Sequence, residues 1–447
     1  MNNNYKENVQ QQKSFNINKK MRSRKDGLSS HLTLVNFMKG MIGSGILTLP
    51  IVFRQSGLWT GFLLVFIFGF LNTLTMALLV RSAHYLAKRR HFNENIENNQ
   101  KNENITENGE KILKNNKKYL NDNEPMSYGE VMEAAFEESG FNWSRKLARP
   151  AKFFVNGTII ILQMGIGCIK YDFIVAHLRE LFGQFTNFHA SALSWALIIF
   201  PPMVLLNFTR TLQRIAILNT FGNFFMFGAY GIIFYHLLQS PHKTSHLPWI
   251  GSPTGVLTAC GSILYCFEGQ AMVLPMENKM KNPSEMLGPF AVLSTGMALT
   301  AIFDAAVGFL GYSKFGNEIQ GSVTLNLPST SLLTFVKIVF TVISFLDFLL
   351  QQYVTIQMLW PPMSKYLSKL LTSSLILRVG EYIFRASLVA LTMLISIFVP
   401  HLEHIMPLVG FSGGVFLAFI FPPIIDTFTF LSMEFSEYFE ENNKKSW

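Results

Sequence analysis

The chain has 447 residues, of which 49% are hydrophobic, 14% aromatic and only 15% charged. This balance is typical of a polytopic membrane protein and excludes an ordinary soluble enzyme. The net charge of +9 does not indicate nucleic-acid binding, because the basic residues concentrate in the N-terminal tail and in a few loops. Three cysteines, all in apolar segments, provide neither a disulfide framework nor a zinc site.

The apolar segments, at about 20 residues per span, predict ten membrane helices. In chain order they cover approximately residues 32–54, 58–83, 150–178, 190–207, 212–238, 252–277, 287–312, 330–358, 378–399 and 403–427. A short amphipathic helix is expected over 128–138. Residues 32–430 therefore form one membrane domain, which is all-α.

Three polar segments are expected to lie outside the bilayer. They are an N-terminal tail over residues 1–31, a low-complexity loop over 84–124 and a C-terminal tail over 431–447. The first tail and the loop have too little apolar surface to offset chain entropy, so both are expected to be disordered. Lys and Arg fall mainly on the side of these segments if the spans alternate, which predicts a cytoplasmic N-terminus.

Two apolar stretches are interrupted by backbone-permissive residues, at Lys39–Gly45 (KGMIGSG) and at Tyr265–Gly269 (YCFEG). Hydrocarbon does not tolerate unsatisfied backbone groups, so such breaks persist only where protein or a watery cavity surrounds them. Breaks in the first and sixth of ten spans favour an inverted repeat that holds a solute between its halves. Close helix packing by small residues is the alternative explanation for Gly43 and Gly45.

Several motifs resemble one membrane protein family. The run Lys39–Pro50 (KGMIGSGILTLP) resembles the first span of the amino acid/auxin permease family, in its proton-coupled amino acid transporter branch. The string Leu274–Pro283 (LPMENKMKNP) resembles the loop after that family's sixth span. Further segments match the family in the same order, at residues 126–131, 311–316 and 321–328.

The resemblance implies a LeuT/APC-like inverted repeat of five plus five helices, alternating access, and transport of small neutral amino acids together with protons. Glycine, alanine and proline are the expected substrates, and no cofactor is expected. Helix N-termini suit a carboxylate and freed carbonyls suit an ammonium. The candidate substrate-binding residues flank the two breaks: Ile42, Gly43, Ser44, Gly45, Tyr265, Phe267, Glu268 and Gly269.

The chain departs from the family at the residues linked to proton coupling. The branch typically has a histidine three residues before the Lys-Gly of the first span, where this chain has Asn36. In the eighth span Asp347 replaces a hydroxyl residue four positions before Gln351. We therefore expect Asp347 and Glu268, with Gln351 and Asn36 nearby, to handle the proton or another coupling cation. The alternative is a structural ion pair of Asp347, for example with Lys39.

Four other charged residues sit in or near the spans. Lys170 and Asp172 are predicted at a solvated outer end of the third span. Asp304 is central in the seventh span and Arg385 is within the ninth, and sequence spacing leaves open whether they form a charge pair. Members of the resembled family usually have an eleventh span and outer-loop cysteines. The sequence given shows no such span, so either the last helix is absent or the sequence is an incomplete product, and the family's outer-loop disulfide is not expected.

Two other functions compete with transport. An amino-acid sensor with little flux is favoured by the loss of the histidine at Asn36, and a sodium-coupled or uncoupled carrier fits the same residues. An enzyme is disfavoured, because the pair His401 and His404 beside Glu403 resembles no zinc signature. The expected location is the plasma membrane or an endolysosomal membrane, and the sequence does not indicate an oligomeric state.

Overall fold

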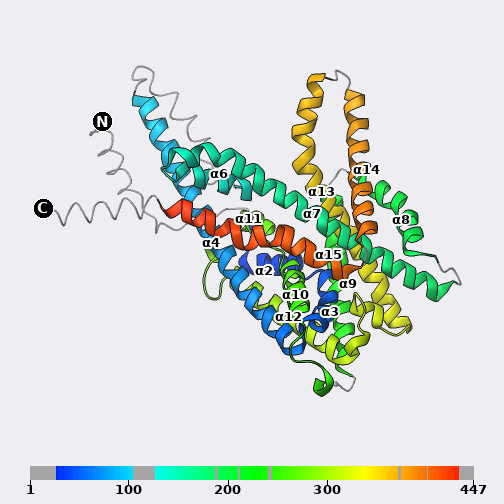
Figure 1. The fold of residues 1–447 in the computed structure, drawn as a ribbon. Coiled ribbons are helices and arrows are strands. Elements are labelled where there is room, and N and C mark those ends of the chain that lie inside the picture. Colours follow the sequence, from blue (N-terminus) through cyan, green and yellow to red (C-terminus); the bar gives the residue numbers. More distant parts are fainter. Residues whose placement is uncertain are drawn as a thin grey trace.

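The computed structural model describes residues 27–103, 126–186, 190–209, 212–239, 244–370, 374–399 and 401–431. These residues are almost entirely helical, and their only β-type pairing is an isolated bridge between Leu28 and Met280. The main helices are α2 (Ser30–Met41), α3 (Leu49–Ser56), α4 (Leu58–Glu103), α6 (Tyr128–Glu138), α7 (Asn142–Phe185), α8 (Ala192–Asn207), α9 (Leu212–Leu238), α10 (Pro253–Cys266), α11 (Gln270–Glu277), α12 (Val292–Phe315), α13 (Ser331–Leu370), α14 (Ser374–Phe398) and α15 (Leu402–Val409) (Figure 1).

Short helices complete the chain between and after these elements. The 3-10 helices are η1 (Ser44–Thr48), η2 (Thr244–His246), η3 (Pro283–Met286), η4 (Gly316–Glu318) and η5 (Val323–Asn326). After α15 the chain continues through two π-helical turns, η6 (Gly410–Gly414) and η7 (Phe416–Ile420), to Leu431.

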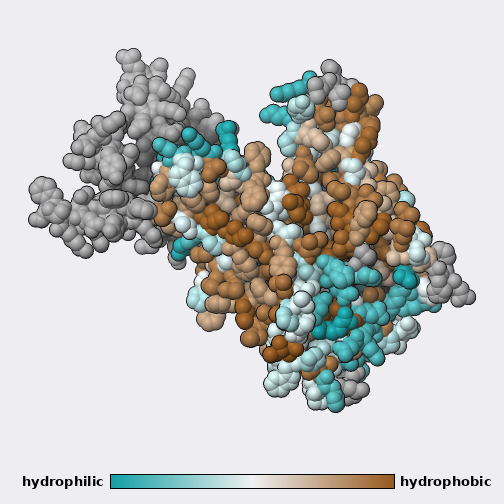
Figure 2. Space-filling model, viewed as in Figure 1, coloured by the Kyte–Doolittle hydropathy of each residue, from teal (hydrophilic) through white to brown (hydrophobic). Residues whose placement is uncertain are grey.

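Most of the long helices could span a membrane. Seven helical segments among the described residues are long and apolar enough to cross a bilayer, counting α10 with α11 and α15 with the turns that follow it. The bent pair Ser30–Met41 and Ser44–Ser56 makes an eighth. Two shorter apolar helices, Ala192–Asn207 and Phe224–Leu238, lie where the fourth and fifth spans were predicted. Figure 2 shows hydrophobic side chains over the visible faces of α8, α13 and α14, as expected for contact with lipid. The prediction of an all-α polytopic membrane protein is confirmed, and the inverted repeat stays a prediction.

The first predicted break divides the first span. Helix α2 begins at an N-cap Ser29, which accepts a hydrogen bond from Leu32 N, and ends at Met41. Ile42 has non-helical dihedral angles (φ −81°, ψ 89°) and Gly43 is extended, so the helical hydrogen-bond ladder stops there. The chain then resumes as η1 and α3, at 43° to α2.

The second predicted break divides the sixth span between α10 and α11. Helix α10 ends at Cys266, and Phe267, Glu268 and Gly269 separate it from α11. Gly269 packs closely on the first span, because a Cβ there would lie 2.2 Å from Met41 Sδ and the Met41 side chain would have to shift. The two breaks are therefore in direct contact.

Helices α10 and α15 cross at a pair of glycines. A Cβ on Gly410 would lie 1.9 Å from the carbonyl oxygen of Gly261, and a Cβ on Gly261 would lie 2.8 Å from Pro407 O. Only glycine allows two backbones to approach so closely. The tenth span is thus fixed against the first half of the sixth.

Helix α6, expected as a short amphipathic helix, begins with a capping box. Ser127 is its N-cap, and the Glu130 carboxylate accepts hydrogen bonds from Ser127 N (2.8 Å) and Ser127 Oγ (2.9 Å). Burial alone would raise the pKa of Glu130, but these hydrogen bonds and the charges of Lys152 and Arg90 lower it below 4.5. Tyr128 OH donates to Leu417 O at 2.7 Å, which anchors α6 to the tenth span.

Helix α4 is longer than the predicted second span. It remains helical to Glu103, so residues 84–103 are helical where the low-complexity loop was expected to begin. This stretch contains no Gly or Pro to end a helix, and extending an existing helix adds one hydrogen bond for each residue fixed. The remaining segments of the predicted tails and loop, residues 1–26, 104–125 and 432–447, lie outside the described residues.

Candidate functional site

The first break presents free backbone donors. Its carbonyl at Gly43 is engaged, because it accepts from Tyr230 OH (2.8 Å) and Ile46 N (3.2 Å). The N–H groups of Ser44 and Gly45 begin η1 and have no acceptor among the described residues. A helix N-terminus of this kind favours an anionic group such as a carboxylate.

The second break is fixed to α4 by two buried amide side chains. Asn72 Nδ2 donates to Phe267 O at 2.8 Å, and Gln270 Nε2 donates to Asn72 Oδ1 at 2.6 Å. Gln270 Oε1 in turn accepts from Gly269 N at 3.2 Å. The Phe267 carbonyl that was expected to face an ammonium is therefore already engaged within the protein. Sequence reasoning missed Asn72 and Gln270, whose polar side chains inside apolar spans were the available signal.

A lysine from the third span joins the first break to the eighth span. Lys170 Nζ donates to Ser44 Oγ (2.7 Å) and forms an ion pair with Asp347 Oδ2 (3.1 Å). Ser344 Oγ lies 3.3 Å from Ser44 Oγ and extends this polar cluster along α13. We refer to Ser44, Lys170 and Asp347 as the lysine cluster.

The structure corrects the predicted position of Lys170. Its side chain is buried, and α7 continues from Asn142 to Phe185, which places Lys170 inside the span and not at a solvated end. The partner of Asp347 is thus Lys170 and not Lys39. Lys170 also interacts electrostatically with Glu268 in the second break. One ammonium therefore faces two carboxylates.

The remaining predicted coupling residues are farther from the cluster. Gln351 lies one helical turn after Asp347 on α13, and both side chains are partly buried. Asn36 is on α2, before the break, and no hydrogen bond between described residues joins it to Asp347 or Gln351. The structure brings together Asp347, Ser44 and Lys170, while Asn36 stays apart.

Aromatic side chains limit the space around the two breaks. Tyr265 is buried, and a Cβ on Gly45 would lie 3.0 Å from its Cε1 atom. Phe267 is fully buried, and Tyr230 packs at the Gly43 carbonyl. Near Gly43 there is more room, because a Cβ there would lie 3.8 Å from Lys170 Nζ.

The considered pair between Asp304 and Arg385 is not present. Arg385 forms an ion pair with Glu381 at 2.9 Å, one turn earlier on α14, and donates to Asn207 O at 2.9 Å. Asp304 has no hydrogen-bond partner among the described residues. An i,i+4 partner on the same helix satisfies Arg385 without help from α12.

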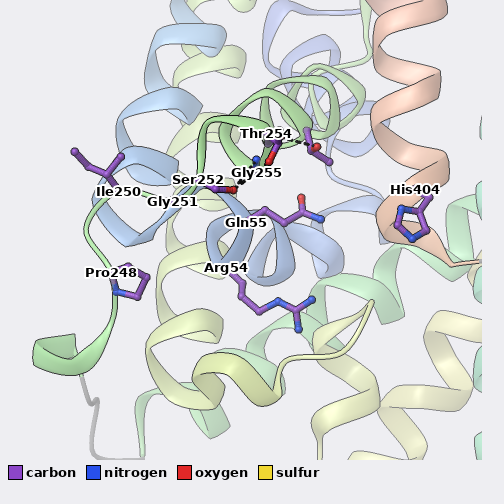
Figure 3. Close-up of a pocket in the computed structure, with 10 residues that line it drawn as sticks. Arg54, Gln55, Pro248, Ile250, Gly251, Ser252, Thr254, Gly255 and His404 are labelled. Atoms are coloured by element: carbon purple, nitrogen blue, oxygen red, sulfur yellow. Dashed lines mark hydrogen bonds between the residues drawn. The ribbon is translucent and has the colours of Figure 1, made fainter.

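An open pocket with polar and apolar lining lies at the ends of α3 and α10 (Figure 3). Its volume is about 490 Å³, and its lining includes Arg54 and Gln55 of α3, Thr258 of α10 and His404 of α15. Arg54 connects α3 to the tenth span through an ion pair with Glu403 at 3.2 Å. On the opposite side, Leu28 pairs with the chain just after α11. Contacts therefore join the broken spans to their surroundings at both ends.

The sequence model of the family described as "Transmembrane amino acid transporter protein" matches residues 27–436. The chain belongs to this family. The match covers both breaks, the lysine cluster and every described helix, so the resemblance seen in the motifs is confirmed. Members of this family are transporters and not enzymes. Among the described residues, no group of three His, Cys, Asp or Glu side chains is placed to hold a metal ion.

Two relatives illustrate the family membership. The chain is 28% identical over 419 residues to the "Probable amino acid transporter skat-1" of Caenorhabditis elegans, covering 91% of this chain and 82% of the relative. It is 27% identical over 411 residues to the "Proton-coupled amino acid transporter-like protein pathetic" of Drosophila melanogaster, covering 91% of this chain and 78% of the relative. Both relatives therefore align with this chain over nearly its whole length.

Proposed function

We propose that this family member is a secondary transporter of small neutral amino acids that couples their movement to protons. The single observation that carries the proposal is the lysine cluster, which places a buried cation and the acid Asp347 at the first break. The same cation acts electrostatically on Glu268 of the second break. The name of the Drosophila relative, which includes proton coupling, supports it.

The substrate carboxylate is assigned to the first break. The free N–H groups of Ser44 and Gly45 supply hydrogen-bond donors, and the ammonium of Lys170 adds a positive charge beside them. Tyr265 and Phe267 leave little room for a long side chain. These features favour glycine, alanine and proline over large or charged amino acids.

The charge balance of the site favours uptake of a proton. Lys170 contributes one positive charge, whereas Asp347 and Glu268 contribute two negative charges when both are ionised. A neutral amino acid is a zwitterion and adds no net charge. An uncompensated carboxylate is costly inside a membrane, so binding one proton at Glu268 or Asp347 restores neutrality when the site closes.

The second candidate function is that of an amino-acid sensor. Asn36, which does not titrate, replaces the histidine expected from the family resemblance, and this favours binding without coupled flux. Sodium coupling is a further alternative for transport, with Asp347 as the cation ligand. Flux measurements under defined ion gradients separate the three.

The deciding experiment is uptake of radiolabelled glycine, alanine and proline into proteoliposomes that contain the full chain. We expect accumulation driven by an inward proton gradient, independent of sodium and strongly reduced in Asp347→Asn and Glu268→Gln. The matched control is Glu180→Gln, which alters another lysine–carboxylate pair between α7 and α13, that of Lys337. Binding without uptake would support the sensor, and dependence on sodium alone would contradict proton coupling.

The membrane and the orientation are part of the proposal. The protein is an integral multi-pass membrane protein, and we propose a cytoplasmic N-terminus in the plasma membrane or an endolysosomal membrane. A protease-protection assay on an N-terminal epitope tag, with fluorescence co-localisation, tests both statements.

A further inference from the structure

An acid in the seventh span has no role in the site described above. The Asp304 side chain is 0% exposed, and neither carboxylate oxygen has a hydrogen-bond partner in the part of the chain that the structure describes. Its position on α12 is between Gly296, which packs on Phe37 of α2, and Gly308, which packs on Phe53 of α3. Asp304 is therefore behind the first break, at the level where α2 gives way to η1 and α3.

The groups around Asp304 connect it to both breaks. It interacts electrostatically with Tyr230 on α9 and with Cys266 at the end of α10. Tyr230 OH donates to Gly43 O, and Cys266 Sγ lies 3.9 Å from Gly45 O. Opening the first break would therefore disturb two side chains in the neighbourhood of Asp304.

Charged groups on the surrounding helices do not compensate Asp304. Among the described residues, neither Lys39 on α2 nor Arg54 on α3 forms a hydrogen bond or an ion pair with Asp304. The part of α4 that packs on α12 near Asp304 contributes Gly69, which faces Ala301. Tyr230 and Cys266 are the titratable groups near Asp304 on α9 and α10, and both are neutral at physiological pH in an apolar setting.

Burial without a partner decides the protonation state of this carboxyl. An isolated carboxylate in a dry interior is so unfavourable that the group binds a proton and becomes neutral. The contrast with Asp347 is direct, because Asp347 has the ammonium of Lys170 as its counter-ion. The surroundings of Asp304 in this conformation therefore favour a neutral carboxylic acid over a carboxylate.

We propose that Asp304 is a second proton-binding site of the transporter, separate from the lysine cluster. It holds a proton while the first break is packed against α9, α10 and α12, and releases it when movement of α2 and η1 lets water reach the carboxyl. The O–H bond of the acid breaks, the proton passes to water, and the carboxylate remains hydrated until the break closes again. Release of the proton from Asp304 rests on the proposed transport function, whereas protonation of Asp304 in the described conformation does not.

Infrared spectroscopy tests the neutral state without any substrate. The purified full chain should show the carbonyl stretch of a neutral carboxylic acid at neutral pH, and Asp304→Asn should remove that band. Asparagine has nearly the shape of the neutral acid, so this variant is expected to fold. Asp304→Glu is the second variant, and it should keep a neutral-acid band at a shifted frequency. A spectrum that is unchanged by both substitutions overturns the proposal.

Transport measurements test proton release. Asp304→Asn should retain exchange of internal for external amino acid but lose accumulation driven by a proton gradient. Asp304→Asn with full proton-driven accumulation overturns the release step, even if the infrared band is lost. If the unaltered chain shows no uptake, the proposed function fails, while the infrared band still decides whether Asp304 is protonated.

Discussion

Removing the ammonium of the lysine cluster provides the sharpest test of the site. Lys170→Met keeps most of the side-chain volume but leaves Asp347 without its counter-ion. The two charges are 3.1 Å apart, which at an effective dielectric constant of about 20 corresponds to an attraction of about 5 kcal/mol. Lost hydration offsets part of this attraction. Since the Asp347 side chain is 19% exposed, we expect a loss of about 3 kcal/mol, the lower end of the range for broken buried pairs.

A double-mutant cycle isolates the pair. Lys170→Met, Asp347→Asn and the double variant would be unfolded in mixed detergent micelles and followed by far-ultraviolet circular dichroism. The double variant leaves no unpaired charge, so its destabilisation should be smaller than the sum of the single effects by about 2 kcal/mol. Additivity within about 0.5 kcal/mol would refute the inferred interaction.

Transport separates a functional pair from a structural one. The double variant should recover stability but not proton-driven uptake, because the acid at residue 347 is missing. Lys337→Met is the matched control, since Lys337 is fully buried and pairs with Glu180 between the same two helices. It should lower stability and leave the ion dependence of uptake unchanged. Full proton-driven uptake by the double variant would show that the lysine cluster is structural only.

Further predictions concern the first break and α6. Gly45→Ala should destabilise the protein by about 1–3 kcal/mol in thermal unfolding, because its Cβ would lie 3.0 Å from the buried Tyr265 ring. Gly43→Ala should unfold at the same temperature as the unaltered chain but show a lower substrate affinity in uptake measurements. Ser127→Ala should weaken α6 by about 1 kcal/mol, seen as faster hydrogen exchange in that helix. The pKa of Glu130 is lowered on folding, so its stabilisation is present above its usual pKa and is lost as the pH falls through the lowered value. Amide hydrogen exchange in α6 should therefore become faster relative to an unfolded reference peptide as the pH falls. In Glu130→Gln this change of the exchange rate with pH should be smaller.

Local sequence signals predicted the helices and both breaks. Glycines inside apolar runs at Gly43, Gly45 and Gly269 mark positions where the backbone departs from a helix, and these departures are present in the structure. The capping residues of α6 are equally local, because Ser127 and Glu130 satisfy each other over one turn. Such features depend on neighbours in the sequence and can therefore be read from it.

Long-range pairing was not predictable in the same way. Lys170 and Asp347 are 177 positions apart in the chain, and no periodicity connects the third span to the eighth. The end of the third span was also placed too early, which made Lys170 seem solvated. Asn72 and Gln270 were missed for the same reason, since each is explained only by its partner on another helix.

The glycine contact between α10 and α15 constrains how the protein can move. With the Gly410 backbone directly on the Gly261 carbonyl, there is no room for even a methyl group between these two segments. We expect a contact this close to keep α10 and α15 together when the protein changes conformation. We therefore expect any change of angle within the sixth span to fall on Phe267, Glu268 and Gly269, which separate α10 from α11. The segment proposed to contact the solute would then also be the hinge of α11.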